Sequence, residues 1–205
     1  MITHADMIAS PWVCRFLPLI PKNQGPVLDL ACGSGRHSRL LLDAGYDVWA
    51  LDKDASLLAP LALLGARCFS FDLETQDSDS CNTGKVNWPF DPDMFSAIIV
   101  TNYLYRPLLS MLTFSLKKQG ILIYETFAAG NEVFGRPRSR DFLLQPGELI
   151  DCFLSEPVST RKNQCIAYEH GQINNPKPAI VQRICLRSIS VTSTIDASRD
   201  HLDGI

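Results

Sequence analysis

Short apolar runs alternate with amphipathic stretches along the first 125 residues of the chain. Five of the runs have the length of buried strands, at residues 26–31, 46–51, 67–71, 95–101 and 121–125. Between them, apolar residues recur at helical spacing in three stretches, at residues 35–44, 57–64 and 107–118. Apolar runs that alternate with helices are typical of parallel strands covered on both faces. The pattern therefore predicts an α/β fold with a doubly wound, mostly parallel sheet.

The rest of the pattern divides the chain into one domain and a tail. Two β-rich segments, 165–169 and 179–186, flank a loop at 171–178 and predict a C-terminal antiparallel hairpin. Four further features are short helices over 3–20 broken at Pro11 and Pro18, a polar surface loop at 74–87, an irregular loop at 127–141 and a short helix at 148–153. We predict a single domain over 1–190, with an N-terminal helical cover over 1–24 and a polar tail over 191–205.

The most informative stretch is residues 27–37, which read Val-Leu-Asp-Leu-Ala-Cys-Gly-Ser-Gly-Arg-His. A buried strand leads into a turn with Gly33 and Gly35, a helix follows, and a second strand ends in Asp52. This order predicts a nucleotide-binding βαβ unit, in which the acid suits the ribose hydroxyls. A dinucleotide fingerprint has a third glycine or alanine where this chain has Ser38, and Asp29 inside the strand suits a cation better than a pyrophosphate.

These residues resemble the class I S-adenosylmethionine-dependent methyltransferases. The segment Asp29–Gly35 matches their first motif, and Asp52 matches their ribose-binding acid. The continuation Gly35–Ser38 and the segment Gly45–Val48 look most like the small tellurite-resistance-type bacterial methyltransferases. Ala31 departs from the pattern, because many members carry glycine there, but alanine is small enough to be tolerated. The resemblance implies a seven-stranded sheet of order 3-2-1-4-5-7-6 and S-adenosylmethionine as the cofactor.

The ligand of an open α/β sheet lies at the carboxyl ends of its strands, near the switch point between strands one and four. This rule and the resemblance give the cofactor-binding candidates Asp29, Ala31, Gly33, Gly35, Arg36, Asp52, Lys53, Asp72, Leu73, Thr101 and Asn102. The resemblance implies that Asp72 accepts a hydrogen bond from the adenine amino group. Two alternatives stay open: Asp72 could be a helix cap or a solvent-facing acid, and Asp29 could bond the amides of the turn.

The candidates for substrate binding and catalysis follow strands four and five. The substrate-binding candidates are Asn102, Tyr103, Arg106, Arg136, Arg138 and Arg140. Three arginines within residues 136–140 suit a carboxylate or a phosphate, with a solvated charge cluster as the alternative. The catalytic candidates are Tyr103, Glu125 and His37, where packing in the core is the alternative for the tyrosine and the histidine.

Composition narrows the choice of partners and compartment. The net charge of −3 gives no bulk attraction to nucleic acid or to an anionic membrane, so we expect neither as a partner. The seven cysteines are scattered without a C-x-x-C pair, so we expect no metal site and no disulfide framework, and the reducing cytoplasm is favoured. Neither a basic leader nor an apolar run of about 18 residues is present, so no signal peptide or membrane span is predicted.

The sequence as a whole predicts transfer of a methyl group from S-adenosylmethionine to a small molecule, which could be anionic. One alternative is an NAD(P)-binding oxidoreductase. Three features disfavour it: Asp29, the missing third glycine and the lack of a second domain. The other is a noncatalytic binding protein on the methyltransferase fold, which the intact acids and glycines of the site disfavour.

Overall fold

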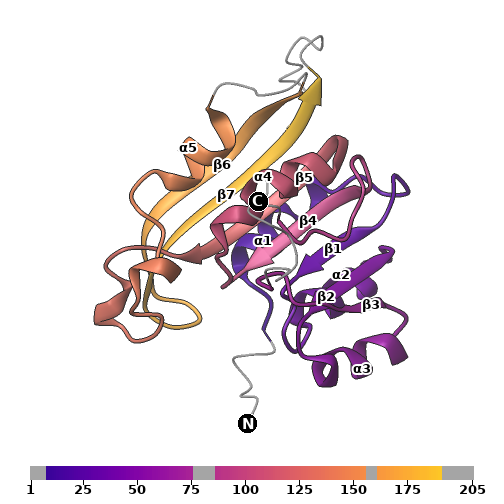
Figure 1. The fold of residues 1–205 in the computed structure, drawn as a ribbon, viewed down its shortest axis with the longest axis horizontal. Helices are drawn as coiled ribbons and strands as arrows, with labels where there is room; N and C mark the ends of the chain where they lie inside the picture. Colours follow the sequence, from indigo (N-terminus) through magenta and orange to yellow (C-terminus); the bar gives the residue numbers. More distant parts are fainter. Residues whose placement is uncertain (1–7, 76–85, 156–160, 191–205) are drawn as a thin grey trace.

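The computed structural model describes residues 8–75, 86–155 and 161–190, which form a mixed sheet of seven strands (Figure 1). The strands are β1 (Val27–Leu30), β2 (Val48–Asp52), β3 (Arg67–Ser70), β4 (Phe95–Thr101), β5 (Leu116–Phe127), β6 (Arg161–Ile173) and β7 (Ala179–Ser190). Their order is β3-β2-β1-β4-β5-β7-β6. The first five strands run parallel, whereas β7 is antiparallel to both β5 and β6. The predicted fold class and the strand order implied by the resemblance are confirmed.

Helices cover both faces of this sheet. They are α1 (Pro11–Phe16), α2 (Arg36–Asp43), α3 (Ala55–Leu63), α4 (Leu109–Ser115) and α5 (Glu148–Leu154), with 3₁₀ turns η2 (Leu17–Leu19), η3 (Arg106–Leu108), η4 (Asn131–Val133) and η5 (Arg140–Phe142). Trp12, Leu41 and Leu61 bury α1, α2 and α3 in the core on one face. Leu112 and Phe153 bury α4 and α5 in the core on the other face.

Side chains along β1 alternate between the two faces of the sheet, and this alternation determines on which face Asp29 lies. Leu28 and Leu30 pack in the core under α4 and α5, whereas Val27 packs in the core under α1, α2 and α3. Successive side chains of a strand point to opposite faces, so Asp29 shares the face of Val27. This face is covered by α2, and the hydroxyl of Ser38 on that helix donates to Asp29.

The helix predicted over 107–118 ends earlier than its spacing suggested. It consists of η3 and then α4, which stops at Ser115. Leu116 is fully buried and pairs with Phe95, so β5 begins there rather than at residue 121. The register shifts after this pair, and Gln119 has a left-handed φ of 67°. Burial of Leu116 against the neighbouring strand thus overrides the helical pattern.

Three other boundaries also differ from the prediction. Pro11 begins α1 instead of breaking a helix, because the first turn needs no N–H from that residue. The hairpin strands are longer than predicted, which leaves only 174–178 between them. The irregular loop at 127–141 contains η4 and most of η5. Residues 1–7, positions 76–85 of the polar loop and the tail at 191–205 lie outside the described residues.

Membrane-spanning and metal-binding features were searched over the described residues. None of their helices combines the length and the apolarity that crossing a membrane requires. The same part of the chain contains no group of three or more His, Cys, Asp or Glu side chains arranged to hold a metal ion. Its six cysteines are free thiols.

Gly35 and Gly45 provide a matched test of packing at the glycine turn. Both have a left-handed φ, 78° and 80°, so alanine is strained by about 1 kcal/mol at either position. A Cβ on Gly35 would lie 2.8 Å from Cγ of Leu61 and closer still to both methyl carbons, whereas one on Gly45 would meet no atom within 4 Å. We expect Gly45→Ala to lower the free energy of unfolding by ~1 kcal/mol and Gly35→Ala by ~2–4 kcal/mol in urea denaturation. Equal losses would show that Leu61 moves aside freely.

Candidate active site

The loop between β1 and α2 has the shape of a ligand cradle. Ala31, Gly33 and Gly35 all have positive φ, at 51°, 55° and 78°. A Cβ on Gly33 would point into open space, whereas one on Gly35 would collide with Leu61 of α3. Gly33 therefore leaves its backbone open to a ligand, and Gly35 allows α3 to pack closely.

Ala31 occupies the position where the sequence departs from the related motif. Its φ of 51° is in the left-handed region, which costs a residue with a Cβ about 1–2 kcal/mol. Many members of the methyltransferase class that the sequence resembles have glycine there, and the left-handed φ at this position explains that preference. The loop thus keeps the glycine-like conformation at an energetic cost.

Asp52 joins this loop to the end of β2. One carboxylate oxygen accepts the backbone N–H of Gly33 at 2.8 Å, and the other accepts that of Asp54 at 3.0 Å. Each carboxylate oxygen has a second lone pair, so Asp52 can still accept hydrogen bonds from two ligand hydroxyls. This geometry suits the vicinal hydroxyls of a ribose.

A pocket of about 230 Å³ opens beside Asp52 at the carboxyl edge of the sheet. It is lined by six of the predicted site residues, Ala31, Asp52, Lys53, Asp72, Leu73 and Tyr103. Leu51, Phe71 and Glu74 also line it and were not predicted. Leu51 and Phe71 end the second and third apolar runs, which was the available signal for them, whereas Glu74 lies beyond the third run. The volume is below the usual range of about 300–1,000 Å³ for small-molecule sites, so it suits part of a cofactor.

Asp72 combines a turn-stabilising role with a place in the pocket. Its Oδ1 accepts the backbone N–H of Glu74 at 3.0 Å, while its backbone carbonyl accepts the hydroxyl of Thr75 at 2.9 Å. The side chain also lines the pocket beside Phe71 and Leu73. An acid beside apolar walls suits the amino group and the faces of a purine.

Asp29 lies beneath the loop and is only 1% exposed. The hydroxyl of Ser38 donates to its Oδ2 at 2.6 Å. Burial raises the pKa of Asp29 to about 6, although the hydrogen bonds from Ser38 and the nearby Arg36 guanidinium oppose this shift. Asp29 is thus a buried acid that supports the start of α2, and its contact with a ligand cation stays a prediction.

The loop after β4 brings two more candidates to the same edge. Asn102 is exposed with a φ of 56°, and its backbone N–H donates to the carbonyl of Glu125 at 2.9 Å. The carbonyl of Tyr103 accepts the hydroxyl of Tyr124 at 2.7 Å. Burial, together with the carboxylate of Glu74, raises the pKa of Tyr103, so its phenol remains a hydrogen-bond donor at neutral pH.

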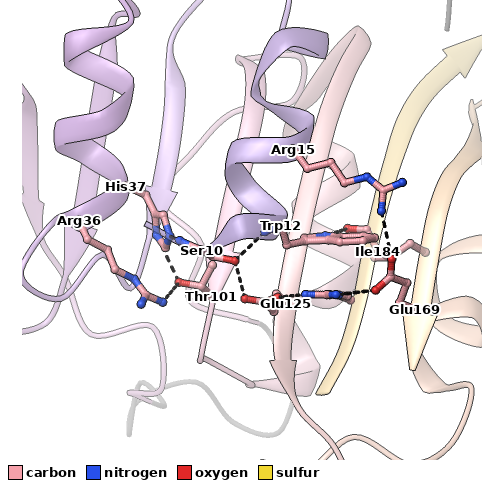
Figure 2. Close-up of polar contacts among 10 residues, drawn as sticks. Ser10, Trp12, Arg15, Arg36, His37, Thr101, Glu125, Glu169 and Ile184 are labelled. Atoms are coloured by element: carbon pink, nitrogen blue, oxygen red, sulfur yellow. Dashed lines mark hydrogen bonds and ion pairs between the residues drawn. The ribbon is translucent and has the colours of Figure 1, made fainter. Parts of the chain in front are cut away.

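Arg36, His37, Thr101 and Glu125 meet around Ser10 at the switch point (Figure 2). His37 Nε2 accepts the backbone N–H of Ser10 at 3.0 Å, which places the ring proton on Nδ1, 3.4 Å from the Thr101 hydroxyl. Burial, and next the Arg36 guanidinium, lowers the pKa of His37 to about 3. The Glu125 carboxylate accepts the Ser10 hydroxyl at 2.7 Å. His37 is therefore a neutral ring with both nitrogens engaged.

The arginine candidates differ in how much of their charge is already paired. Arg106 makes two hydrogen bonds to the Glu148 carboxylate, at 2.6 and 3.0 Å, and donates to the carbonyls of Asp141 and Leu143. It therefore anchors the loop before α5. Three of the other predicted substrate residues on that loop are exposed, Arg136, Arg138 and Arg140.

Replacing Asp29 tests the cost of burying a carboxyl under the loop. Folding raises its pKa from 3.8 to about 6, so the folded chain holds this proton more tightly than the unfolded chain. The stability that this group contributes is full below pH 3.8, falls as the pH rises towards 6 and stays lost above it. Asp29→Asn, which never ionises and can still accept from Ser38, should raise the free energy of unfolding by up to ~3 kcal/mol at about pH 8. Urea denaturation should show little difference at about pH 4, and a gain independent of pH would contradict this account.

Comparison with known proteins was made in sequence and in structure. Residues 19–116 match the family described as tellurite resistance protein TehB. No curated protein matches the chain in sequence. The matched segment runs from η2 to the first residue of β5 and includes the glycine loop, Asp52 and Asp72.

Several solved structures share the fold. TehB from Haemophilus influenzae is 19% identical with a TM-score of 0.62, and the match covers 88% of this chain and 62% of that one. An S-adenosylmethionine-dependent methyltransferase from Mesorhizobium loti is 14% identical with a TM-score of 0.61, over 87% and 98% of the two chains. The PH0226 protein from Pyrococcus horikoshii is 16% identical with a TM-score of 0.59, over 91% and 95%.

The sequence match and the shared fold point in the same direction as the pocket. Several of the solved proteins that share this fold are S-adenosylmethionine-dependent methyltransferases. The open backbone at Gly33, the paired acceptor positions of Asp52 and the acid and apolar walls beyond it have the chemistry that an adenosine-containing ligand needs. The chain has the fold of the class I S-adenosylmethionine-dependent methyltransferases, and over residues 19–116 it is similar in sequence to the TehB tellurite-resistance family.

Proposed function

We propose that the protein transfers a methyl group from S-adenosylmethionine to a small anionic molecule. The observation that carries this proposal is the pocket at the carboxyl edge of the sheet, where Asp52 and Asp72 flank apolar walls beside the open backbone of Gly33. Asp52 would accept from the ribose hydroxyls and Asp72 from the adenine amino group. The rest of the cofactor would extend towards Arg36 and Thr101, because β3 on the other side is the edge of the sheet.

The bound cofactor supplies a methyl group that is already activated on a sulfonium. The chain has to hold the acceptor in line with it, and such positioning can contribute roughly 7–11 kcal/mol to the rate. A general base is required only when the acceptor must lose a proton. Both predicted bases are buried and already engaged, since His37 Nε2 accepts from Ser10 and the Glu125 oxygens accept from Ser10 and Arg183. An acceptor that is already an anion needs no base, which supports an anionic nucleophile.

Cations near the acceptor side also support an anionic substrate. Arg136, Arg138 and Arg140 follow β5 on an exposed loop, which the Arg106–Glu148 pair holds at its far end. Tellurite, named in the description of the matched family, is an oxyanion of this chemical class. The net charge of −3 disfavours nucleic acid as the acceptor, so a small molecule remains the proposed partner. The free thiols favour a reducing compartment such as the cytoplasm.

Ligand-dependent stability tests the proposed function directly. S-adenosylhomocysteine should raise the melting temperature and should bind in calorimetry, whereas NAD should do neither, because the pocket has acids where a pyrophosphate would need donors.

Two neighbouring acids give a matched pair of variants. Asp52→Asn should weaken S-adenosylhomocysteine binding by ~1–3 kcal/mol. Asp54→Asn should leave it unchanged, because Asp54 caps α3 outside the pocket and asparagine is an equally good cap. Binding of NAD alone would overturn the proposal.

A charge-neutral arginine loop tests the anionic acceptor. Candidate oxyanions and thiolates, tellurite among them, would first be screened for release of S-adenosylhomocysteine. The triple variant Arg136→Gln, Arg138→Gln and Arg140→Gln should then raise KM for the acceptor about tenfold or more while cofactor affinity is kept. The control removes the same charge near the opposite edge of the sheet, through Lys22→Gln, Lys118→Gln and Lys162→Gln. Equal KM values for the two triple variants would show that the arginines are only a solvated surface.

A further inference from the structure

The segment before α1 runs directly beside the cofactor loop. The backbone N–H of Ser10 donates to His37 Nε2 at 3.0 Å, and the carbonyl of Ile8 accepts from Arg36 Nη1 at 3.3 Å. Arg36 and His37 immediately follow Gly35, the last residue of the glycine turn. The first described residues of the chain are thus bonded to the start of α2.

Ser10 connects this contact to the end of β5. Its hydroxyl donates to Glu125 Oε1 at 2.7 Å and accepts the backbone N–H of Trp12 at 3.1 Å, which caps α1. Figure 2 shows Ser10 between His37 on one side and Glu125 on the other. Ser10 is 4% exposed and Glu125 is 6% exposed, so a lost hydrogen bond here is not replaced freely by water.

A partly buried ion pair holds Glu125 in place. Arg183 Nη1 donates to Glu125 Oε2 at 3.0 Å, and the same guanidinium also binds Glu169. The guanidinium of Arg183 lies 4.7 Å from the centre of the Trp12 ring. Since breaking this pair would leave the carboxylate of Glu125, which is 6% exposed, without its cation, the arrangement fixes α1 against β5 and β7. It thereby fixes the segment that precedes α1.

We propose that Ser10 is a positioning residue for the cofactor, acting through His37 and Glu125 to hold the segment from Ile8 to Trp12 against the amino-acid tail of the ligand. This inference rests on the proposed function. The adenosine part of the ligand is assigned to the pocket at Asp52 and Asp72, and its tail extends towards Arg36. Among the described residues, the two polar contacts of the Arg36 guanidinium are uncharged, the Ile8 carbonyl and the Thr101 hydroxyl at 3.5 Å. A carboxylate on the tail is the chemical group that this guanidinium fits best.

Two ligands separate the tail from the nucleoside in calorimetric titration. S-adenosylhomocysteine carries the amino-acid tail, whereas 5′-methylthioadenosine keeps the nucleoside and the thioether without it. Ser10→Ala should weaken S-adenosylhomocysteine binding about three- to tenfold and leave methylthioadenosine affinity unchanged. Ser10→Thr, which retains the hydroxyl, should restore most of the loss. Ser10→Gly is the second variant, because glycine is tolerated at a helix N-cap. Like the other two variants it keeps the backbone N–H that binds His37, so it should weaken S-adenosylhomocysteine binding through the lost hydroxyl alone.

A pair of arginine variants controls for general loosening of α1. Arg183→Gln removes the partner of Glu125 and should reduce affinity selectively for S-adenosylhomocysteine. Arg15→Gln, on α1, removes the more exposed pair with Glu169 and the guanidinium contacts with the Trp12 and Phe16 rings but leaves Glu125 paired. It should not change either affinity. Three results would overturn the positioning role but not the proposed function. They are equal losses of affinity for both ligands in Ser10→Ala, unchanged S-adenosylhomocysteine affinity in Ser10→Gly, and equal effects of the two arginine variants. Wild-type protein that binds neither ligand would overturn the proposed function, and the inference with it.

Discussion

The hydrogen bond from the Gly33 backbone to Asp52 is the contact on which the site depends. It joins the loop after β1 to the end of β2, two segments 19 residues apart in the chain. The same carboxylate receives the N–H of Asp54, which opens α3, and α3 in turn packs Leu61 against Gly35. Because parallel strands end at a common edge, one side chain can fix the loop, the following helix and the pocket wall together. A ligand at this edge would therefore meet donors and acceptors already placed.

The residues of this site that lower the stability of the fold lie in and beneath the loop rather than in the pocket. Ala31 holds a left-handed φ that glycine would adopt without strain, and Asp29 is a carboxyl with almost no exposure to water. Each feature opposes folding at neutral pH, although Asp29 also accepts the Ser38 hydroxyl. Features that break local rules are expected at functional sites. The strain at Ala31 and the raised pKa of Asp29 therefore agree with the pocket in locating the site at this loop.

The sequence predicted those parts of the fold and site that are local. The apolar run around Asp29, the glycine turn and the acid after the second run all lie within residues 26–52, and their order is enough to place Asp52 in the pocket. Contacts between distant segments could not be predicted in this way. Leu116 joins β5 because Phe95 pairs with it, although its neighbours have helical spacing. Ser10 meets Glu125 across 115 positions, and nothing in either local pattern indicates the other.

Ion pairs already made within the chain determine which cations are available to an anion. Arg106, a predicted substrate residue that follows β4, already makes four hydrogen bonds, two to Glu148 and two to carbonyls. Arg183 is likewise shared between Glu125 and Glu169. Arg36 at the switch point keeps uncharged partners among the described residues, and the exposed loop adds Arg136, Arg138 and Arg140. An acidic chain can thus present positive charge at one edge of its sheet, because its carboxylates neutralise the arginines that hold the fold and leave others for a ligand.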